Sequence, residues 1–112
     1  MHMEVTSRAE GDTVVIYVDG DLTTNSSSEA EEEINQILQG QSNNVIINVE
    51  KVNFIASTGL RIILALGKRL SGDGCKLCVC AMNPTTKSVF EMSGFSKLFP
   101  IFDSEEEALN KI

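Results

Sequence analysis

Ser57 is the residue of this sequence whose position is best suited to a chemical modification. It stands where an apolar segment, Val52–Ala56, runs into Ser57-Thr58-Gly59 ahead of a helix expected from Leu60. Serine at such a junction is a preferred N-cap, and we expect its oxygen to accept a hydrogen bond from the amide of Gly59 or Leu60. The same place suits a phosphoserine, because free amides and the helix dipole stabilise a phosphate there. The residues alone leave capping and phosphorylation both open.

Catalytic groups that could act with Ser57 are missing from the sequence. Its one histidine, His2, falls in residues 1–2, which we interpret as an expression scar. A serine nucleophile needs a neighbouring base, and neither of the common glycine-rich phosphate loops is present. Asp19 and Asp21 flank Gly20 as residues of a turn rather than as an acid–base pair. We therefore expect a protein that is not an enzyme and that has no cofactor.

Three cysteines lie close together, and their spacing raises the question of a metal or redox site. Cys75, Cys78 and Cys80 fall in a segment with strand character, 75–81. Cys78 and Cys80 would share one face of that strand, and Cys75 would point to the other. No credible histidine completes a ligand set. We expect reduced, buried core thiols and no metal.

The composition describes one globular domain over residues 1–112 with an acidic character. The chain is 42% apolar and 22% charged, and its formal net charge is −7. An excess of acid disfavours binding to nucleic acids and to anionic membranes. The sequence shows no membrane-spanning apolar run and no signal peptide, so we expect a cytoplasmic protein.

Strand and helix signals alternate along the chain in a way that predicts an α/β fold. Apolar, β-branched runs indicate strands over about 3–7, 13–18, 45–49, 52–56, 75–81 and 99–102. Helices are expected after the capping boxes Ser26-x-x-Glu29 or Ser28-x-x-Glu31, from Leu60, over Thr85–Ser93 behind the N-cap Asn83 and Pro84, and after the capping box Ser104-x-x-Glu107. Such alternation favours a mixed, mostly parallel sheet of four to five strands with about four helices, the first two strands pairing antiparallel at an edge. The helix from Leu60 is apolar around much of its circumference, which leaves a monomer or a weak dimer open.

Several short motifs give these elements a family likeness. The apolar strand followed by Ser57-Thr-Gly-Leu-Arg61, with Val18-Asp-Gly-Asp-Leu22 upstream and Met82-Asn-Pro84 and Met92-Ser-Gly-Phe95 downstream, resembles the STAS-domain anti-sigma factor antagonists of bacteria. The likeness extends from about Val14 to Leu109. It implies a single STAS-like domain.

The resemblance also implies a function in transcription regulation by partner switching. In that family the serine matching Ser57 accepts phosphate from an anti-sigma factor that is also a serine kinase. The unphosphorylated protein binds that anti-sigma factor and releases a sigma factor, phosphorylation abolishes the binding, and a dedicated serine phosphatase restores it. The partner face that the resemblance implies for this chain consists of Asp21, Thr23, Thr24, Ser57, Thr58, Gly59 and Arg61.

Two positions depart from the family pattern. Ala56 and Thr23 stand where family members often carry an acid, and both would lie near the phosphate. The loss of two negative charges either eases phosphorylation or marks a member that is no longer a kinase substrate. The alternative function is a STAS accessory or sensor module that binds a transporter component, a nucleotide or another small ligand without switching sigma factors.

Overall fold

The structure is a computed structural model that describes residues 3–41 and 43–112. The expected scar at residues 1–2 lies outside the described residues. In chain order the described part forms β1 (Glu4–Glu10), β2 (Thr13–Asp19), α1 (Ser27–Leu38), β3 (Asn44–Lys51), α2 (Ser57–Gly72), β4 (Leu77–Cys80), α3 (Pro84–Met92), the short 3₁₀ helix η1 (Phe95–Lys97), β5 (Ile101–Phe102) and α4 (Glu105–Lys111). This is the alternation that the sequence predicts.

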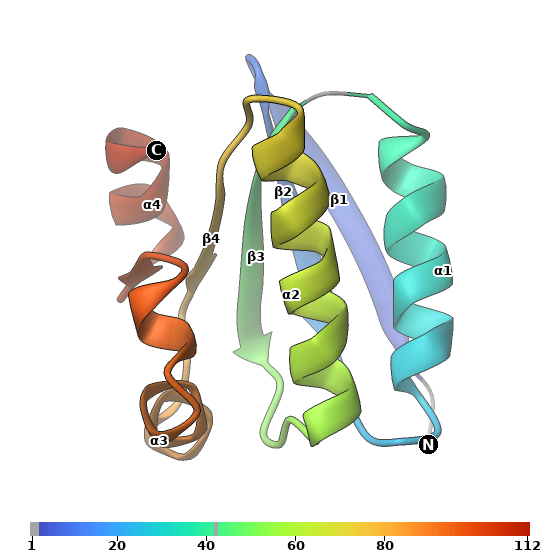
Figure 1. The fold of residues 1–112 in the computed structure, drawn as a ribbon, viewed down its shortest axis with the longest axis vertical. Helices are drawn as coiled ribbons and strands as arrows, with labels where there is room; N and C mark the ends of the chain where they lie inside the picture. Colours follow the sequence, from blue (N-terminus) through green and yellow to red (C-terminus); the bar gives the residue numbers. More distant parts are fainter. Residues whose placement is uncertain (1–2, 42) are drawn as a thin grey trace.

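The strands form one mixed sheet in the order β1-β2-β3-β4-β5. β1 pairs antiparallel with β2 at the edge, and the remaining neighbours are parallel, which confirms the predicted sheet. Because parallel strands end at the same edge of a sheet, the loops that follow β2, β3 and β4 gather there (Figure 1). Ser57 lies at this edge, at the start of α2.

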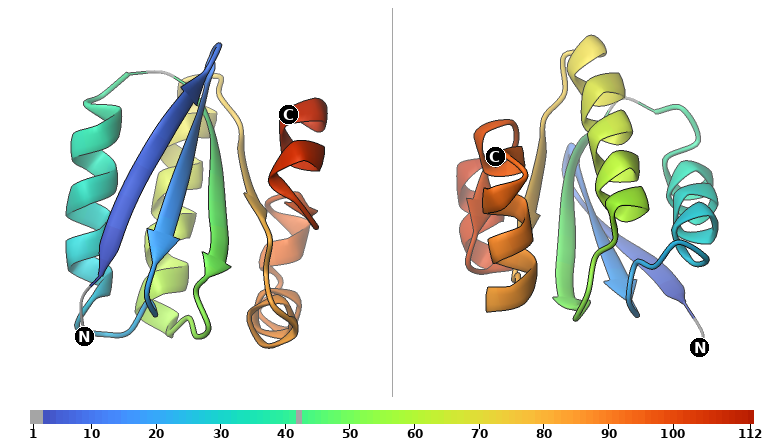
Figure 2. Two further views of the ribbon diagram at one scale, coloured as in Figure 1. Left: turned by 180° about the vertical axis from the view of Figure 1, so that it is seen from behind. Right: turned by 60° about the horizontal axis from the view of Figure 1, so that its bottom comes forward.

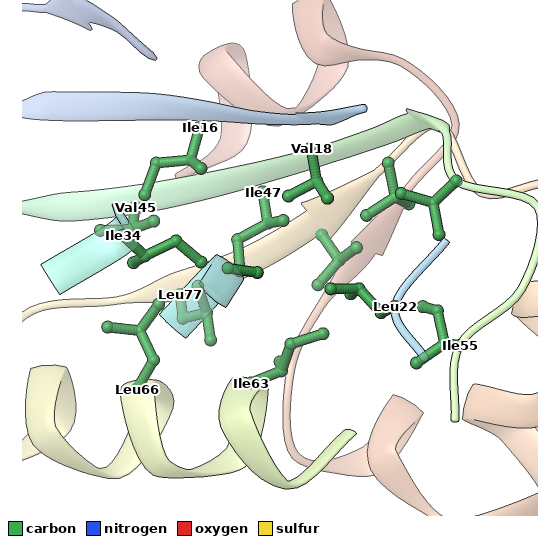
Figure 3. Packing of buried hydrophobic residues seen from close by; sticks show 14 of the residues in the cluster. Ile16, Val18, Leu22, Ile34, Val45, Ile47, Ile55, Ile63, Leu66 and Leu77 are labelled. Atoms are coloured by element: carbon green, nitrogen blue, oxygen red, sulfur yellow. The ribbon is translucent and has the colours of Figure 1, made fainter. Parts of the chain in front are cut away.

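Helices cover both faces of the sheet, and the larger core lies under α1 and α2 (Figure 2). Side chains of α2, including Ile63 and Leu66, point toward Ile47 of β3 and Leu77 of β4 (Figure 3). On the opposite face, Ala108 of α4 belongs to a smaller buried cluster with residues of β2, β3 and β4. Among the described residues, none of the helices is long and apolar enough to cross a membrane.

The bounds of several elements differ from the sequence predictions. β1 extends to Glu10 rather than Ser7, because it pairs with β2 along its whole length across the Gly11-Asp12 turn. The second half of this edge strand is exposed and mostly polar, so the sequence carries no apolar signal for it. β5 starts at Ile101 rather than Phe99. Phe99 instead packs its ring against α2 at Gly67, where a side chain would leave it no room.

The cysteine segment forms a shorter strand than predicted, Leu77–Cys80 rather than 75–81. Cys78 and Cys80 are buried and belong to the cluster under α4, whereas Cys75 is half-buried against the core on the opposite face. The predicted division of the three thiols between the two faces is therefore confirmed. Burial raises the pKa of both Cys78 and Cys80 to about 12, so these thiols stay protonated and are poor nucleophiles.

A polar cluster attaches α4 to the sheet. The Glu105 carboxylate accepts hydrogen bonds from Arg8 Nη2 at 2.7 Å, from Tyr17 Oη at 3.0 Å and from Asn48 Nδ2 at 3.1 Å. These donors come from β1, β2 and β3, so one side chain connects α4 to three strands. Burial alone would raise the pKa of Glu105, but the three hydrogen bonds outweigh it and hold the pKa below its ordinary value.

This cluster should make stability depend on pH. A carboxyl group whose pKa is lowered by folding stabilises the native state above its unfolded pKa, and the contribution is lost as the pH falls through the folded pKa. The Glu105 side chain is 24% exposed, so we expect Glu105→Gln to cost only about 1 kcal/mol at neutral pH. The free energy of unfolding, measured by urea denaturation from about pH 7 to about pH 3, should show the two proteins converging in acid. A difference that stays constant over this range would contradict the assigned role.

The contact between Phe99 and α2 gives a second prediction. A Cβ atom at Gly67 would lie 2.2 Å from Cε1 of Phe99, so Gly67→Ala must displace the ring. We expect a loss of about 1–3 kcal/mol in the free energy of unfolding. Gly72→Ala is the matched control in the same helix, because a Cβ there meets nothing within 4 Å. Equal stability of the two variants would show that α2 and Phe99 are not closely packed.

Candidate functional site

Ser57 is the first residue of α2, and its side chain is exposed. The expectation that it caps a helix starting at Leu60 is wrong. Ala56 is the N-cap in an extended conformation, its carbonyl accepts from Leu60 N at 3.1 Å, and no side chain caps the helix. Within the described part of the chain, no group forms a hydrogen bond with the Ser57 hydroxyl. The hydroxyl is therefore free to react or to meet a partner.

α2 starts at Ser57 rather than at Leu60 because its N-cap, Ala56, is hydrogen-bonded to the loop between β2 and α1. Ala56 N donates to the Leu22 carbonyl at 2.7 Å, and Leu22 N donates to the Phe54 carbonyl at 3.0 Å. Leu22 and Ile55 form a parallel bridge, and both side chains are buried (Figure 3). The expected strand 52–56 is thus reduced to this single bridge. It joins the two loops that carry the candidate site.

Asp21 strengthens the same connection. Its Oδ1 accepts from Asn53 N at 2.9 Å and from Phe54 N at 3.2 Å. The side chain therefore does more than form a turn: it satisfies two amides of the neighbouring loop, for which helix and sheet offer no partner. This role could not be predicted from the sequence, because the hydrogen bonds join residues 32 and 33 positions apart and no local pattern indicates them.

Hydroxyl groups fill the space between the two loops and the helix that follows each. Ser26 Oγ accepts from Thr23 N at 2.9 Å and donates to the Asp21 carbonyl at 2.7 Å. Thr58 Oγ1 donates toward Ser27 Oγ at 3.3 Å and toward the Thr23 carbonyl at 3.5 Å. Thr58 is half-buried and its hydroxyl is hydrogen-bonded, whereas the neighbouring Ser57 is exposed.

Neither of the two capping boxes predicted for α1 forms. Ser26 is the N-cap, but its side chain turns back to the loop and makes no cap hydrogen bond. Ser28 lies within the first turn of the helix and is exposed. The Ser26 hydroxyl bonds to the loop because backbone groups of Asp21 and Thr23 have no partner in a neighbouring strand. The predicted N-cap Asn83 is confirmed, because its side chain accepts from Thr86 N. Of the capping box predicted at Ser104, one half forms: Ser104 Oγ accepts from Glu107 N, but Glu107 Oε1 accepts from Asp103 N rather than from Ser104 N.

Gly59 permits α2 to approach the β2–α1 loop closely. A Cβ atom at this position would lie 2.9 Å from Leu22 Cβ and 3.1 Å from Ile55 Cγ2. Gly59 is buried, so it faces the two joined loops rather than solvent. The missing side chain of Gly59 thus allows the start of α2, with Ser57, to pack directly against Leu22 and Ile55.

The remaining predicted site residues lie in two neighbouring hollows. Thr24, Thr58 and Arg61 line a groove between the N-terminal halves of α1 and α2. Asp21 and Thr23 line a second hollow, together with Met3 and Glu29 and other residues of the β2–α1 loop. The structure therefore brings the predicted residues to one end of the molecule but divides them between two hollows. No cluster of three or more metal-ligating side chains occurs in the portion that the structure describes.

The link made by Asp21 can be tested by substitution. Asp21→Ala removes the acceptor of two amides, and we expect a loss of about 1–3 kcal/mol in the free energy of unfolding. Hydrogen exchange at the amides of Asn53 and Phe54 should accelerate before that of the β3 amides. Asp21→Asn keeps an acceptor oxygen and serves as the control, with slower exchange than the alanine variant. Unchanged exchange at both amides in Asp21→Ala would contradict the assignment.

Known proteins of similar sequence and fold cover nearly the whole of this chain. The anti-sigma F factor antagonist of Paenibacillus polymyxa is 25% identical over 113 residues, which cover 100% of this chain and 97% of that protein. The crystal structure of an anti-sigma factor antagonist from Mycobacterium paratuberculosis has a TM-score of 0.87 with 23% identity, and the match covers 97% of this chain and 92% of that chain.

The anti-sigma factor antagonist SpoIIAA is similar in two states. Its unphosphorylated form has a TM-score of 0.79 with 25% identity, covering 98% of this chain and 95% of that chain. The phosphorylated form of SpoIIAA from Bacillus has a TM-score of 0.72 with 25% identity and covers 98% of both chains. Residues 4–108 match the STAS domain family, which is nearly the whole chain. The protein therefore belongs to the STAS domain family.

Proposed function

We propose that this protein is an anti-sigma factor antagonist whose binding to an anti-sigma factor is switched by phosphorylation of Ser57. The observation that carries the proposal is the exposed hydroxyl of Ser57, which forms no hydrogen bond within the described residues. The loop that leads to Ser57 is held in place by hydrogen bonds to Leu22 and Asp21. The names of similar proteins support it, since relatives that cover the whole chain are anti-sigma factor antagonists. One of them, SpoIIAA, has a phosphorylated form. The protein would act by binding, without an enzymatic activity or a cofactor of its own.

The first turn of α2 can accept a phosphate without unfolding. The γ-phosphoryl group of MgATP would be transferred to Ser57 Oγ by the anti-sigma factor acting as a serine kinase, with release of ADP and the hydroxyl proton. The product carries about two negative charges at the positive end of a helix, which the dipole and the free amides stabilise. Arg61 lies four residues along the helix, on the same face as Ser57, and adds a positive charge.

The same phosphate would end partner binding. It adds charge and bulk at an edge that, in the unmodified protein, presents an uncharged hydroxyl. Burying that charge in an interface without a matching cation is costly. A serine phosphatase that hydrolyses the ester would return Ser57 to the free hydroxyl and restore binding.

The neighbourhood of Ser57 favours modification at that residue over Thr58. The Thr58 hydroxyl is half-buried and hydrogen-bonded, so a kinase would need to disrupt the joined loops to reach it. The residue before Ser57 is Ala56, which places no carboxylate against the incoming phosphate. Thr23, at the other position that departs from the family pattern, is also uncharged.

Substitutions at Ser57 test the switch. Ser57→Asp should weaken binding to a candidate anti-sigma factor from the source organism by at least about 1–3 kcal/mol, since a charge would be desolvated at the interface. Ser57→Ala should bind as wild type and also keep its stability, because the Ser57 side chain does not cap α2. Isothermal titration calorimetry with each purified variant measures the first effect, and thermal unfolding measures the second.

Incubation with the same protein and MgATP supplies the matching control. Wild type should gain one phosphate, mapped to Ser57 by mass spectrometry, and Ser57→Ala should gain none even though Thr58 is intact. Equal binding by Ser57→Asp and wild type would refute the switch. Absence of both binding and phosphorylation would favour the accessory or sensor module instead.

A further inference from the structure

Phe54 is a large apolar side chain that the core does not use. It is 49% exposed, while its loop neighbours Val52 and Ile55 are buried at 0% and 3% exposure. Those two residues fill the space under the loop, so a polar residue at position 54 would leave the core unchanged. The fold therefore does not require an aromatic ring at position 54, and half of this side chain is available for contact with a partner.

The backbone of Phe54 is held on both sides. Its N–H donates to Asp21 Oδ1 at 3.2 Å, and its carbonyl accepts from Leu22 N at 3.0 Å. The ring is therefore presented to solvent from a fixed backbone rather than from a mobile loop. Rigid presentation lowers the entropy cost of burying a side chain in an interface, which is why fixed aromatic residues are effective binding anchors.

The ring also lies next to the residue that carries the proposed switch. Phe54 precedes Ser57 by three positions, so their Cα atoms are at most about 11 Å apart. Both residues are exposed in the segment that joins β3 to α2, with half-buried Ala56 and buried Ile55 between them. A partner that contacts the Ser57 hydroxyl would therefore cover Phe54 as well.

We infer that Phe54 is the apolar anchor of the interface with the anti-sigma factor, and that it inserts into an apolar pocket of that partner beside the groups that contact Ser57. This inference rests on the proposed function and adds the chemistry of the partner surface. Interfaces concentrate their binding energy in a few aromatic residues surrounded by polar ones. Here the exposed polar surround includes Asn53 and Ser57. A phosphate on Ser57 would then place a negative charge beside the apolar contact between Phe54 and the partner, and would weaken that contact.

Alanine substitution at two exposed apolar positions tests the inference. Phe54→Ala should raise the Kd for the same candidate anti-sigma factor at least about tenfold, measured by titration calorimetry. Leu98→Ala is the matched control: Leu98 is 59% exposed, but it lines a groove with Ser71 and Cys75 at the opposite end of α2. We expect its Kd to stay within about twofold of wild type, as it does for most exposed residues away from the centre of an interface. Phe54→Leu keeps an apolar side chain and should restore most of the affinity.

A folding control separates binding from stability. Because Phe54 contributes little to the core, the Tm of Phe54→Ala should remain within about 3 °C of wild type. Wild-type affinity in a folded Phe54→Ala protein, or an equal loss in Leu98→Ala, would overturn the inference while leaving the Ser57 switch intact. If wild type binds but Ser57→Asp binds equally well, the switch fails and the anchor survives. If wild type itself does not bind, both proposals fail.

Discussion

The connection between two loops is the constraint on which the candidate site depends. The β2–α1 loop and the β3–α2 loop are far apart in the sequence, yet Leu22 exchanges hydrogen bonds with Phe54 and Ala56. The Asp21 carboxylate adds two further bonds to the same segment. These bonds fix Ala56 in an extended conformation, which makes Ser57 rather than Leu60 the first residue of α2. The position of the exposed hydroxyl thus follows from contacts that Ser57 itself does not make.

The parallel sheet determines where this connection is placed. β2 and β3 deliver their loops to one edge, and a third loop, after β4, joins them when Asn83 Nδ2 donates to the Val52 carbonyl at 3.4 Å. Buried and exposed positions then alternate over a few residues: Val52 and Ile55 face the core, and Phe54 and Ser57 face solvent. A rigid edge with an aromatic ring and a free hydroxyl is suited to binding a protein and to being modified with little effect on the fold.

Most of the architecture could be predicted from the sequence, because its signals are local. Apolar runs placed β2 and β3, and the Asn83-Pro84 and Ser104 caps placed α3 and α4. The site was less accessible to sequence reasoning. Serine before an apolar helix was interpreted as a cap, because the bond from Ala56 to Leu22 that extends the helix arises from tertiary structure. The same holds for Ser26, whose side chain serves the loop, and for Phe54, whose exposure depends on which neighbours fill the core.

In the function that we propose, the state of the Ser57 hydroxyl determines whether the protein binds its partner. The most direct measurement compares a single preparation of wild-type protein before and after stoichiometric phosphorylation, with the phosphate mapped to Ser57 and the Kd for the anti-sigma factor measured in both states. We expect an intact fold and a Kd raised by at least about tenfold in the phosphorylated state, since the added charge must be desolvated at the interface. Equal affinity of the two states, with Ser57 fully phosphorylated, would contradict it.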